Sequence, residues 1–147
     1  MILLVQRVLR AAVRVNGETV SRIGRGMLVL ACVEPGDGEA EADEAARRTA
    51  EWRFFEDAAG KTNLDVLASG GEVLAVPQFT LGADLSRGRR PGFEGAARPA
   101  EAEPLFRAYA AGLRARGVPV STGVFGARME VELVNDGPAT FHWRTRR

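Results

Sequence analysis

The chain has 147 residues, 46% of them hydrophobic and 27% charged, with a net charge of +1. These values are typical of a folded globular protein and suit one domain, residues 1–147, whose core needs no disulfide. One cysteine and one histidine, Cys32 and His142, are too few for a typical zinc site, so we expect no metal. No apolar stretch reaches 18 residues, and we therefore expect no membrane partner and a cytoplasmic location.

The N-terminal part of the chain is predicted to form a sheet. Residues 2–8 and 11–15 have the apolar pattern of strands, with a break or bulge near Arg10. Asn16-Gly17 between two valine-containing segments favours a hairpin turn. Residues 27–33 then form a continuous apolar run, which is typical of a strand that is buried on both faces.

Two helices are predicted. Alanine and aromatic residues recur at helical spacing over residues 39–57, with Asp37 as a candidate N-cap. A second apolar helical face ends at Gly117. Its start has two alternatives: either Pro104 lies in the first turn, or the helix begins at Pro99 and is kinked at Pro104.

The remaining strands frame two irregular segments. Residues 73–76 predict a short strand, followed by a Gly-, Pro- and Arg-rich loop over 82–99, and loops of that length are usually functional or mobile. Residues 129–134 alternate as in a half-buried strand, and 139–143 predict a final strand. Asp136-Gly137 between them favours a hairpin turn. Together these elements predict one α/β domain with more sheet than helix.

The segment that follows the 73–76 strand carries groups suited to chemistry. Gln78 offers an amide, Thr80 offers a hydroxyl, and the backbone N–H groups of Phe79 and Thr80 could face a developing oxyanion. The alternative interpretation is an ordinary strand with Phe79 and Leu81 in the core. The single histidine, His142, lies near the end of a predicted strand and is interpreted as a surface or structural residue.

Several motifs, taken in order and at their spacing, resemble the D-aminoacyl-tRNA deacylase family of the bacterial and eukaryotic type. The resemblance covers essentially the whole chain. Each motif alone would be weakly specific, whereas their shared order over a chain of family length is strongly specific. The matching segments are QRV at 6–8, NG at 16–17, GKTNLDV at 60–66, QFTL at 78–81, RGRRPGF at 87–93 and MEVELVNDGPAT at 129–140.

The resemblance implies both a fold and an activity. The family fold is a single-domain, sheet-rich, layered α/β/β fold with two main helices that dimerises through its sheets. Its members hydrolyse the ester between a D-amino acid and the terminal adenosine of tRNA, and they also act on glycyl-tRNA. By similarity, the chain is expected to be a homodimer with active sites at the interface and to need no cofactor.

The resemblance also assigns roles to particular residues. Gln78, Phe79 and Thr80 line one side of each catalytic pocket. The dipeptide Gly137-Pro138, with a cis peptide bond, reaches in from the partner subunit as the chirality filter. Arg7 helps to hold that dipeptide. Carbonyl groups of the dipeptide would accept hydrogen bonds from the substrate ammonium, while the rigid backbone clashes with an L side chain, so specificity comes from exclusion.

The bond-breaking step has two alternatives. Thr80 could act as the nucleophile, but the sequence identifies no base beside it. Alternatively, the N–H groups of Phe79 and Thr80 stabilise the oxyanion while the ribose 2′-hydroxyl of the substrate assists, and this route is favoured. Pro77 is a departure, because the family pattern usually has serine there, and proline lacks both the hydroxyl and a backbone N–H.

The acceptor end of tRNA is the expected partner, rather than DNA. Residues 85–128 contain eight arginines and three glutamates, which fits either a basic surface that makes salt-dependent phosphate contacts or a general compositional bias toward Ala, Gly and Arg. Phe79 or Phe125 could pack near the terminal adenine, although both are also candidates for the core. A non-enzymatic protein that binds the CCA end and a hydrolase of another small ester or amide remain alternatives. The expected tRNA-binding residues are Arg87, Arg89, Arg90 and Arg98, with Arg144, Arg146 and Arg147 as further candidates.

Overall fold

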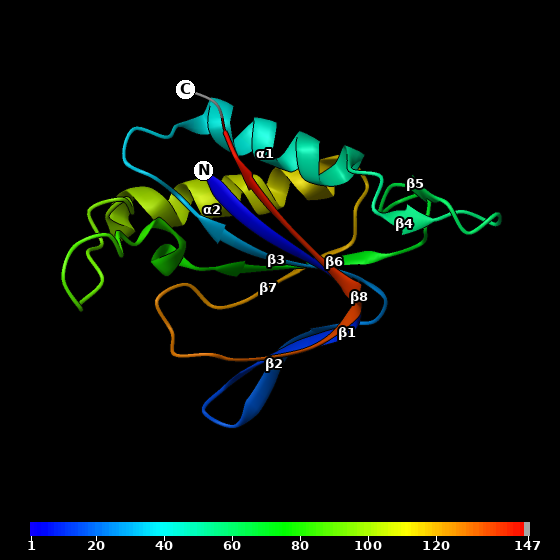
Figure 1. Ribbon diagram of the computed structural model, residues 1–147, viewed down its shortest axis with the longest axis horizontal. Coiled ribbons are helices and arrows are strands. Elements are labelled where there is room, and N and C mark those ends of the chain that lie inside the picture. Colours follow the sequence, from blue (N-terminus) through cyan, green and yellow to red (C-terminus); the bar gives the residue numbers. More distant parts are fainter. Residues whose placement is uncertain (146–147) are drawn as a thin grey trace.

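Two helices cover one face of a sheet in the computed structural model, which describes residues 1–145 (Figure 1). Within that range six strands form the main sheet and two short strands form a separate ribbon. The predicted sheet-rich α/β fold with two main helices is confirmed. The elements are β1 (Ile2–Val15), β2 (Glu18–Ile23), β3 (Gly26–Cys32), α1 (Glu39–Glu51), β4 (Phe55–Glu56), β5 (Thr62–Leu64), β6 (Glu72–Pro77), the 3-10 helix η1 (Phe79–Gly82), α2 (Pro99–Ala115), β7 (Val120–Thr122) and β8 (Glu130–Arg144).

The long strand β1 organises the sheet. Its first half pairs antiparallel with β3 and its second half pairs antiparallel with β2, while β8 runs antiparallel along its other edge. From β3 the sheet continues through parallel pairing to β6 and then to β7. The register of β1 with β8 shifts between Gln6 and Val8 and again between Val8 and Arg10. The predicted irregularity near Arg10 is therefore confirmed.

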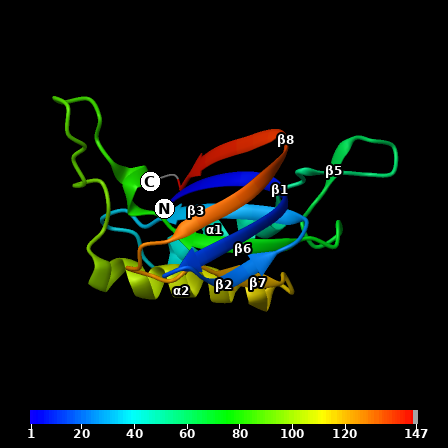
Figure 2. The ribbon, with the colours of Figure 1, turned by 90° about the horizontal axis from the view of Figure 1, so that it is seen from below.

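The core has two layers, one on each side of the sheet. The first lies between the sheet and the helices and contains Tyr109, Phe55 and Met27, all fully buried. The second lies on the face away from the helices, where the bent second half of β1 curls over β3 and β6, and includes Val13 and Leu74. Figure 2 shows α2 beneath the sheet and β8 crossing above β1. The valine- and leucine-rich strands are buried on both faces, which explains their continuous apolar runs.

Helix α1 is shorter than predicted. It ends at Glu51, because Trp52 adopts an extended backbone with φ −64° and ψ 125°. The apolar residues beyond it, including Phe55, face the core from β4 rather than from a helix. The proposed cap was also wrong, since Gly38 is the N-cap and its N–H donates to Glu41 at 2.8 Å.

Helix α2 begins at Pro99 and contains Pro104 within it, so the earlier of the two predicted starts is the observed one. The predicted hairpin turn at Asp136-Gly137 was wrong. The segments 129–134 and 139–143 belong largely to one strand, β8, and both halves pair antiparallel with β1. The chain therefore keeps its direction through this segment, and Asp136-Gly137 lies within a strand that continues beyond it.

Candidate active site

A hollow of about 790 Å³ lies where the ends of β3 and β6 meet the start of α2. Most of its lining is apolar, and Gln78, Arg98 and Glu103 add an amide and two opposite charges. Pockets of this size and mixed lining are typical of small-molecule sites. The structure thus brings Gln78, Phe79 and Arg98 to one hollow, whereas the side chain of Thr80 is exposed and does not line it.

The segment from Gln78 to Thr80 presents two backbone donors. Strand β6 ends at Pro77, and the Gln78 N–H donates to the Ala31 carbonyl at 2.8 Å, which fixes the start of η1. The N–H groups of Phe79 and Thr80 donate to no residue that the structure describes, as is usual at the first turn of a helix. Two backbone donors are therefore available at this end of β6.

The hydroxyl of Thr80 is already engaged. The Gln78 side-chain amide lies against it, with Nε2 donating to Oγ1. Within residues 1–145, no imidazole, carboxylate or amine forms a hydrogen bond with Thr80 Oγ1. A threonine nucleophile needs a base at hydrogen-bond distance, so this geometry suits a positioning role better than nucleophilic attack.

Two aromatic rings lie at the mouth of the hollow. Phe79 is 57% exposed, which excludes the alternative in which it belongs to the core of a strand. Its ring meets that of Phe93, 41% exposed, edge to face at a centroid distance of 5.1 Å. Phe125 lines the same hollow from the segment before β8. Exposed aromatic faces of this kind can stack on nucleic-acid bases.

Cys32, at the end of β3, contacts the backbone of η1. Its Sγ lies 3.5 Å from the Phe79 carbonyl and 3.4 Å from the carbonyl of Val33, and it receives the N–H of Gly82. Burial raises the pKa of the Cys32 thiol above its ordinary value. A buried, neutral thiol holding two backbone groups of η1 is a structural contact. No local pattern predicts this contact, because Cys32 and Phe79 lie 47 residues apart in the chain.

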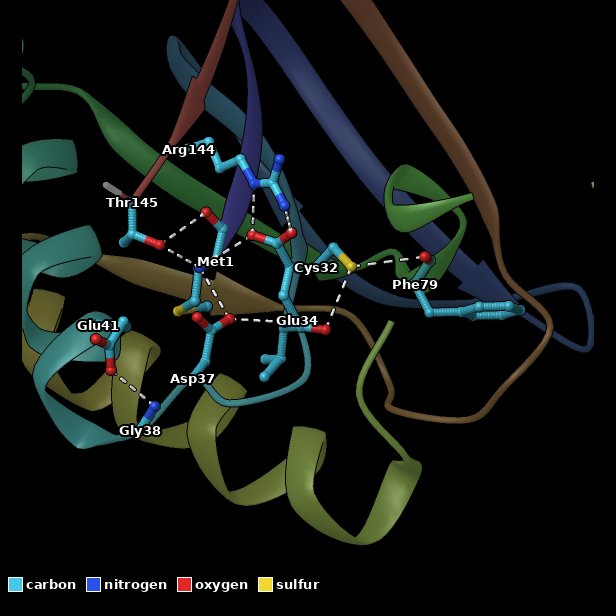
Figure 3. A network of polar contacts seen from close by, with 10 residues as sticks. Met1, Cys32, Glu34, Asp37, Gly38, Glu41, Phe79, Arg144 and Thr145 are labelled. Carbon is cyan, nitrogen blue, oxygen red and sulfur yellow. Dashed lines mark hydrogen bonds and ion pairs between the residues drawn. The ribbon is translucent and has the colours of Figure 1, made fainter. Parts of the chain in front are cut away.

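A buried polar network fastens the neighbouring chain ends (Figure 3). The amino group of Met1 donates to Thr145 Oγ1 at 2.5 Å and lies 2.8 Å from the carboxylate of Asp37. Arg144 binds the nearly buried Glu34 carboxylate with two nitrogens, Nε at 2.9 Å and Nη2. The guanidinium of Arg144 is therefore paired with Glu34, which makes Arg144 a poorer candidate for contact with RNA phosphates. Arg146 and Arg147 lie outside the described residues.

The arginine-rich loop projects from the sheet as a narrow excursion. Its two sides are joined between Asp84 and Gly92, with N–H to carbonyl distances of 2.8 and 2.9 Å. The Ser86 hydroxyl and N–H donate to the Asp84 carboxylate and lower its pKa. Beyond this bridge three exposed arginine side chains make no hydrogen bond or ion pair with any described residue, which leaves them available to bind an anion. They are Arg87, Arg89 and Arg90.

The Gly137-Pro138 dipeptide lies on an outward excursion of β8. Its peptide bond is cis, and both residues are exposed. In the ladder with β1, Thr140 pairs with Gln6 and Asn135 pairs with Val8, so four residues of β8 lie opposite Arg7 alone. Such bulges occur at functional sites, where they aim a short piece of chain away from the sheet.

Arg7 holds this excursion against the body of the domain. Its Nε donates to the Asp136 carbonyl at 3.0 Å and lies 3.4 Å from the Asp136 carboxylate. Its Nη1 donates to the Phe54 carbonyl at 2.7 Å. With a side chain only 13% exposed, Arg7 ties the β8 excursion to the segment after α1. It therefore lies directly beside the dipeptide.

Within one chain the two candidate segments do not meet. Gly137 and Pro138 are absent from the lining of the hollow beside Gln78 and Phe79. Figures 1 and 2 place η1 and the middle of β8 towards opposite ends of the sheet. In the described part of the chain, no group of three or more His, Cys, Asp or Glu side chains could hold a metal ion. None of the described helices is long and apolar enough to span a membrane.

Comparisons with known proteins indicate the same family as the sequence motifs do. The family model described as D-Tyr-tRNA(Tyr) deacylase matches residues 4–144. A protein of Ruegeria pomeroyi named D-aminoacyl-tRNA deacylase is 56% identical over 93% of this chain and 94% of its own. One of Symbiobacterium thermophilum with the same name is 57% identical over 92% and 90%. The chain therefore belongs to the D-Tyr-tRNA(Tyr) deacylase family, and it is an enzyme of the deacylase class.

Two solved structures share its fold. One, described as a c-Myc DNA unwinding element binding protein, has a TM-score of 0.95 and 37% identity over the full length of both chains. The other, described as a probable eukaryotic D-amino acid tRNA deacylase, has a TM-score of 0.84 and 19% identity over 97% of each chain. The second similarity concerns the fold alone.

Proposed function

We propose that the protein hydrolyses the ester of D-aminoacyl-tRNA and, with the same site, that of glycyl-tRNA. Membership of the deacylase family supports the proposal that the substrate is an aminoacyl ester of tRNA. The site assignment depends on the N–H groups of Phe79 and Thr80, which have no hydrogen-bond acceptor among residues 1–145 and lie beside a hollow of about 790 Å³. That volume is ample for an aminoacyl-adenosine, and the exposed rings of Phe79 and Phe93 offer surfaces for its base.

In the proposed chemistry, water attacks the ester carbonyl carbon and the bond to the ribose 3′-oxygen breaks. The Phe79 and Thr80 N–H groups stabilise the oxyanion, and a single such donor is worth about 100-fold or more in rate. The adjacent 2′-hydroxyl of the substrate assists the water, and the 3′-oxygen leaves with a proton. Thr80, held by the Gln78 amide, positions these groups. Pro77 leaves this arrangement intact, because neither of the two donors belongs to it.

The active unit is proposed to be a homodimer. The sheet face away from the helices carries five partly buried apolar side chains, Val15, Leu30, Met129, Val131 and Leu133. A second copy on this face would cover them and could bring Gly137-Pro138 of one subunit to the hollow of the other. The dipeptide then admits glycine and D residues and blocks the direction of an L side chain. This arrangement explains why the two segments lie apart within one chain.

The proposed tRNA contacts are Arg87, Arg89 and Arg90 on the loop and Arg98 in the hollow. The first three have no protein partner among the described residues, and phosphate contacts through arginine position a nucleic acid without reading its sequence. The cytoplasm is the proposed location, since that is where charged tRNA is used. DNA is not a proposed ligand, although one structural relative is described as a DNA-element binding protein.

A subunit-mixing experiment tests the shared site. The variants Q78A/T80A and G137A are each expected to be nearly inactive on D-tyrosyl-tRNA as homodimers. If each site combines Gln78 and Thr80 of one subunit with Gly137 of the other, one site in every mixed dimer is intact. Random exchange at equal amounts then restores about a quarter of the wild-type activity. No recovery, with exchange verified by mass spectrometry, would contradict the shared site.

A further inference from the structure

The side chain of Asn135 closes a ring across the β8 excursion. Its Oδ1 accepts the Ala139 N–H at 2.8 Å, and its Nδ2 donates to the Ala139 carbonyl at 3.1 Å. One amide side chain thus makes the two hydrogen bonds that a strand neighbour would otherwise make with Ala139. The residues between them, Asp136 to Pro138, are held as a closed loop of fixed width.

A second set of contacts ties this ring to the sheet. Asn135 Nδ2 also lies 3.0 Å from Gln6 Oε1 and 3.2 Å from Thr140 Oγ1. Gln6 and Arg7 are neighbours on β1, and successive strand side chains point to opposite faces. Gln6 therefore holds the ring through Asn135 from one face, while Arg7 binds the Asp136 carbonyl from the other.

The loop inside the ring is closely packed. A Cβ built on Gly137 would lie 2.3 Å from the backbone nitrogen of Ala139, the same nitrogen that donates to Asn135. The loop therefore has no room for a side chain at Gly137, on the side that the Ala139 amide occupies. Releasing this amide would let the exposed dipeptide shift, although Arg7 still holds the Asp136 end.

We propose that Asn135, supported by Gln6, is a positioning residue that holds the Gly137-Pro138 backbone at the distance that separates mirror-image substrates. This inference rests on the proposed function, in which that backbone excludes the L side chain. Asn135 touches no substrate atom in this account. Its effect on specificity passes through the Ala139 amide and the loop that this amide closes.

The variants N135D and N135A test the proposal, with N16D as the matched control. Aspartate at 135 still accepts the Ala139 N–H, but its second oxygen faces the carbonyl of Ala139 and the amide oxygen of Gln6, so repulsion replaces two hydrogen bonds. N16D makes the same charge change in the exposed hairpin turn, at φ 51°. The primary measurement is the ratio of kcat/KM for D-tyrosyl-tRNA to that for L-tyrosyl-tRNA.

We expect the ratio to fall about tenfold or more in N135D and N135A, as the loss of one to two net hydrogen bonds implies, and to stay unchanged in N16D. A merely structural role would lower both rates together and leave the ratio unchanged, and that result would overturn the proposal. Q6A, which keeps the ring but removes its support, is expected to lie between N135A and the wild type.

Amide hydrogen exchange supplies a readout that does not depend on catalysis. The Ala139 amide is expected to exchange at least about tenfold faster in N135A than in the wild type, because its acceptor is lost. An unchanged exchange rate at Ala139 would overturn the proposal that Asn135 holds this loop, even if the ratio of kcat/KM for the D ester to that for the L ester fell. If the wild type showed no preference for the D ester, the proposed function would fail, and this exchange measurement would still decide whether Asn135 holds the loop.

Discussion

The substitution Gly137→Ala probes the shape of the β8 excursion most sharply. An alanine Cβ at this position would lie 2.3 Å from the Ala139 nitrogen and 3.0 Å from the Ala139 Cβ. Ordinary contacts between such atoms are about 3.5 Å, so the dipeptide must move by about 1 Å. A misplacement of that size typically costs about 100-fold in rate, or ~2.7 kcal/mol of transition-state stabilisation. We therefore expect kcat/KM on D-tyrosyl-tRNA to fall about 100-fold.

The matched control is Gly24→Ala. A Cβ at Gly24 meets only the Glu72 carboxylate, at an ordinary 3.7 Å, and its backbone needs no positive φ. It is expected to keep wild-type kinetics. Both variants are assayed by the release of radiolabelled D-tyrosine, with circular dichroism to verify folding. A folded Gly137→Ala variant with kcat/KM within about threefold of the wild type would refute the role given to the dipeptide, since a 1 Å shift would then be harmless.

Three further predictions follow from the site. Thr80→Ala is expected to lower kcat about tenfold or more while tRNA affinity, measured by filter binding, changes less than twofold; equal losses in both would argue against a catalytic-centre role. Arg89→Gln with Arg90→Gln is expected to weaken tRNA binding and reduce its salt dependence by about one phosphate contact for each arginine, whereas Arg47→Gln on α1 leaves the salt slope unchanged; an unchanged slope in the double variant would exclude the loop from the RNA surface. The raised pKa of the buried Cys32 means that its stabilising effect is complete below the ordinary thiol pKa of about 8.5 and is lost as the pH rises through the folded-state value. Urea unfolding of the wild type is therefore expected to show a steeper loss of stability above about pH 9 than that of Cys32→Ala, and parallel profiles would contradict this.

Local sequence signals pointed to one of the two segments of the candidate site. Gln78, Phe79 and Thr80 were identified because the segment combines functional groups with the end of an apolar strand, and the structure places two of these residues at a hollow. The role expected for Gly137-Pro138 came from the resemblance of the surrounding motif to the deacylase family, since local rules favoured a hairpin turn there. Such short motifs depend on the residue types at a few neighbouring positions, so they can be recognised without knowledge of the tertiary structure.

Other features depend on partners that are distant in the chain. Asp136-Gly137 favoured a hairpin turn by local rules, but the pairing of both halves of β8 with β1 made it an excursion from a continuous strand. Trp52 kept the helical apolar spacing, yet its ring packs on Phe54 and Trp143 outside the helix. Tertiary contacts override local preference in both cases.

The polar contacts of Asn135 and Cys32 were missed for the same reason. Asn135 reaches Gln6 across 129 positions, and Cys32 reaches Phe79 across 47. Asparagine before Asp-Gly is also common in simple turns, so its residue type carried no separate signal. Their roles became apparent only when the register of β1 with β8 and the path of η1 were known.

The central claim is that this fold removes D-amino acids from tRNA and spares their mirror images. Its most direct test incubates the purified protein with D-tyrosyl-tRNA and L-tyrosyl-tRNA in parallel and follows the intact ester over time. The account predicts rapid loss of the D ester with the L ester remaining at the rate seen without protein. Equal loss of both esters, or loss of neither, would contradict it.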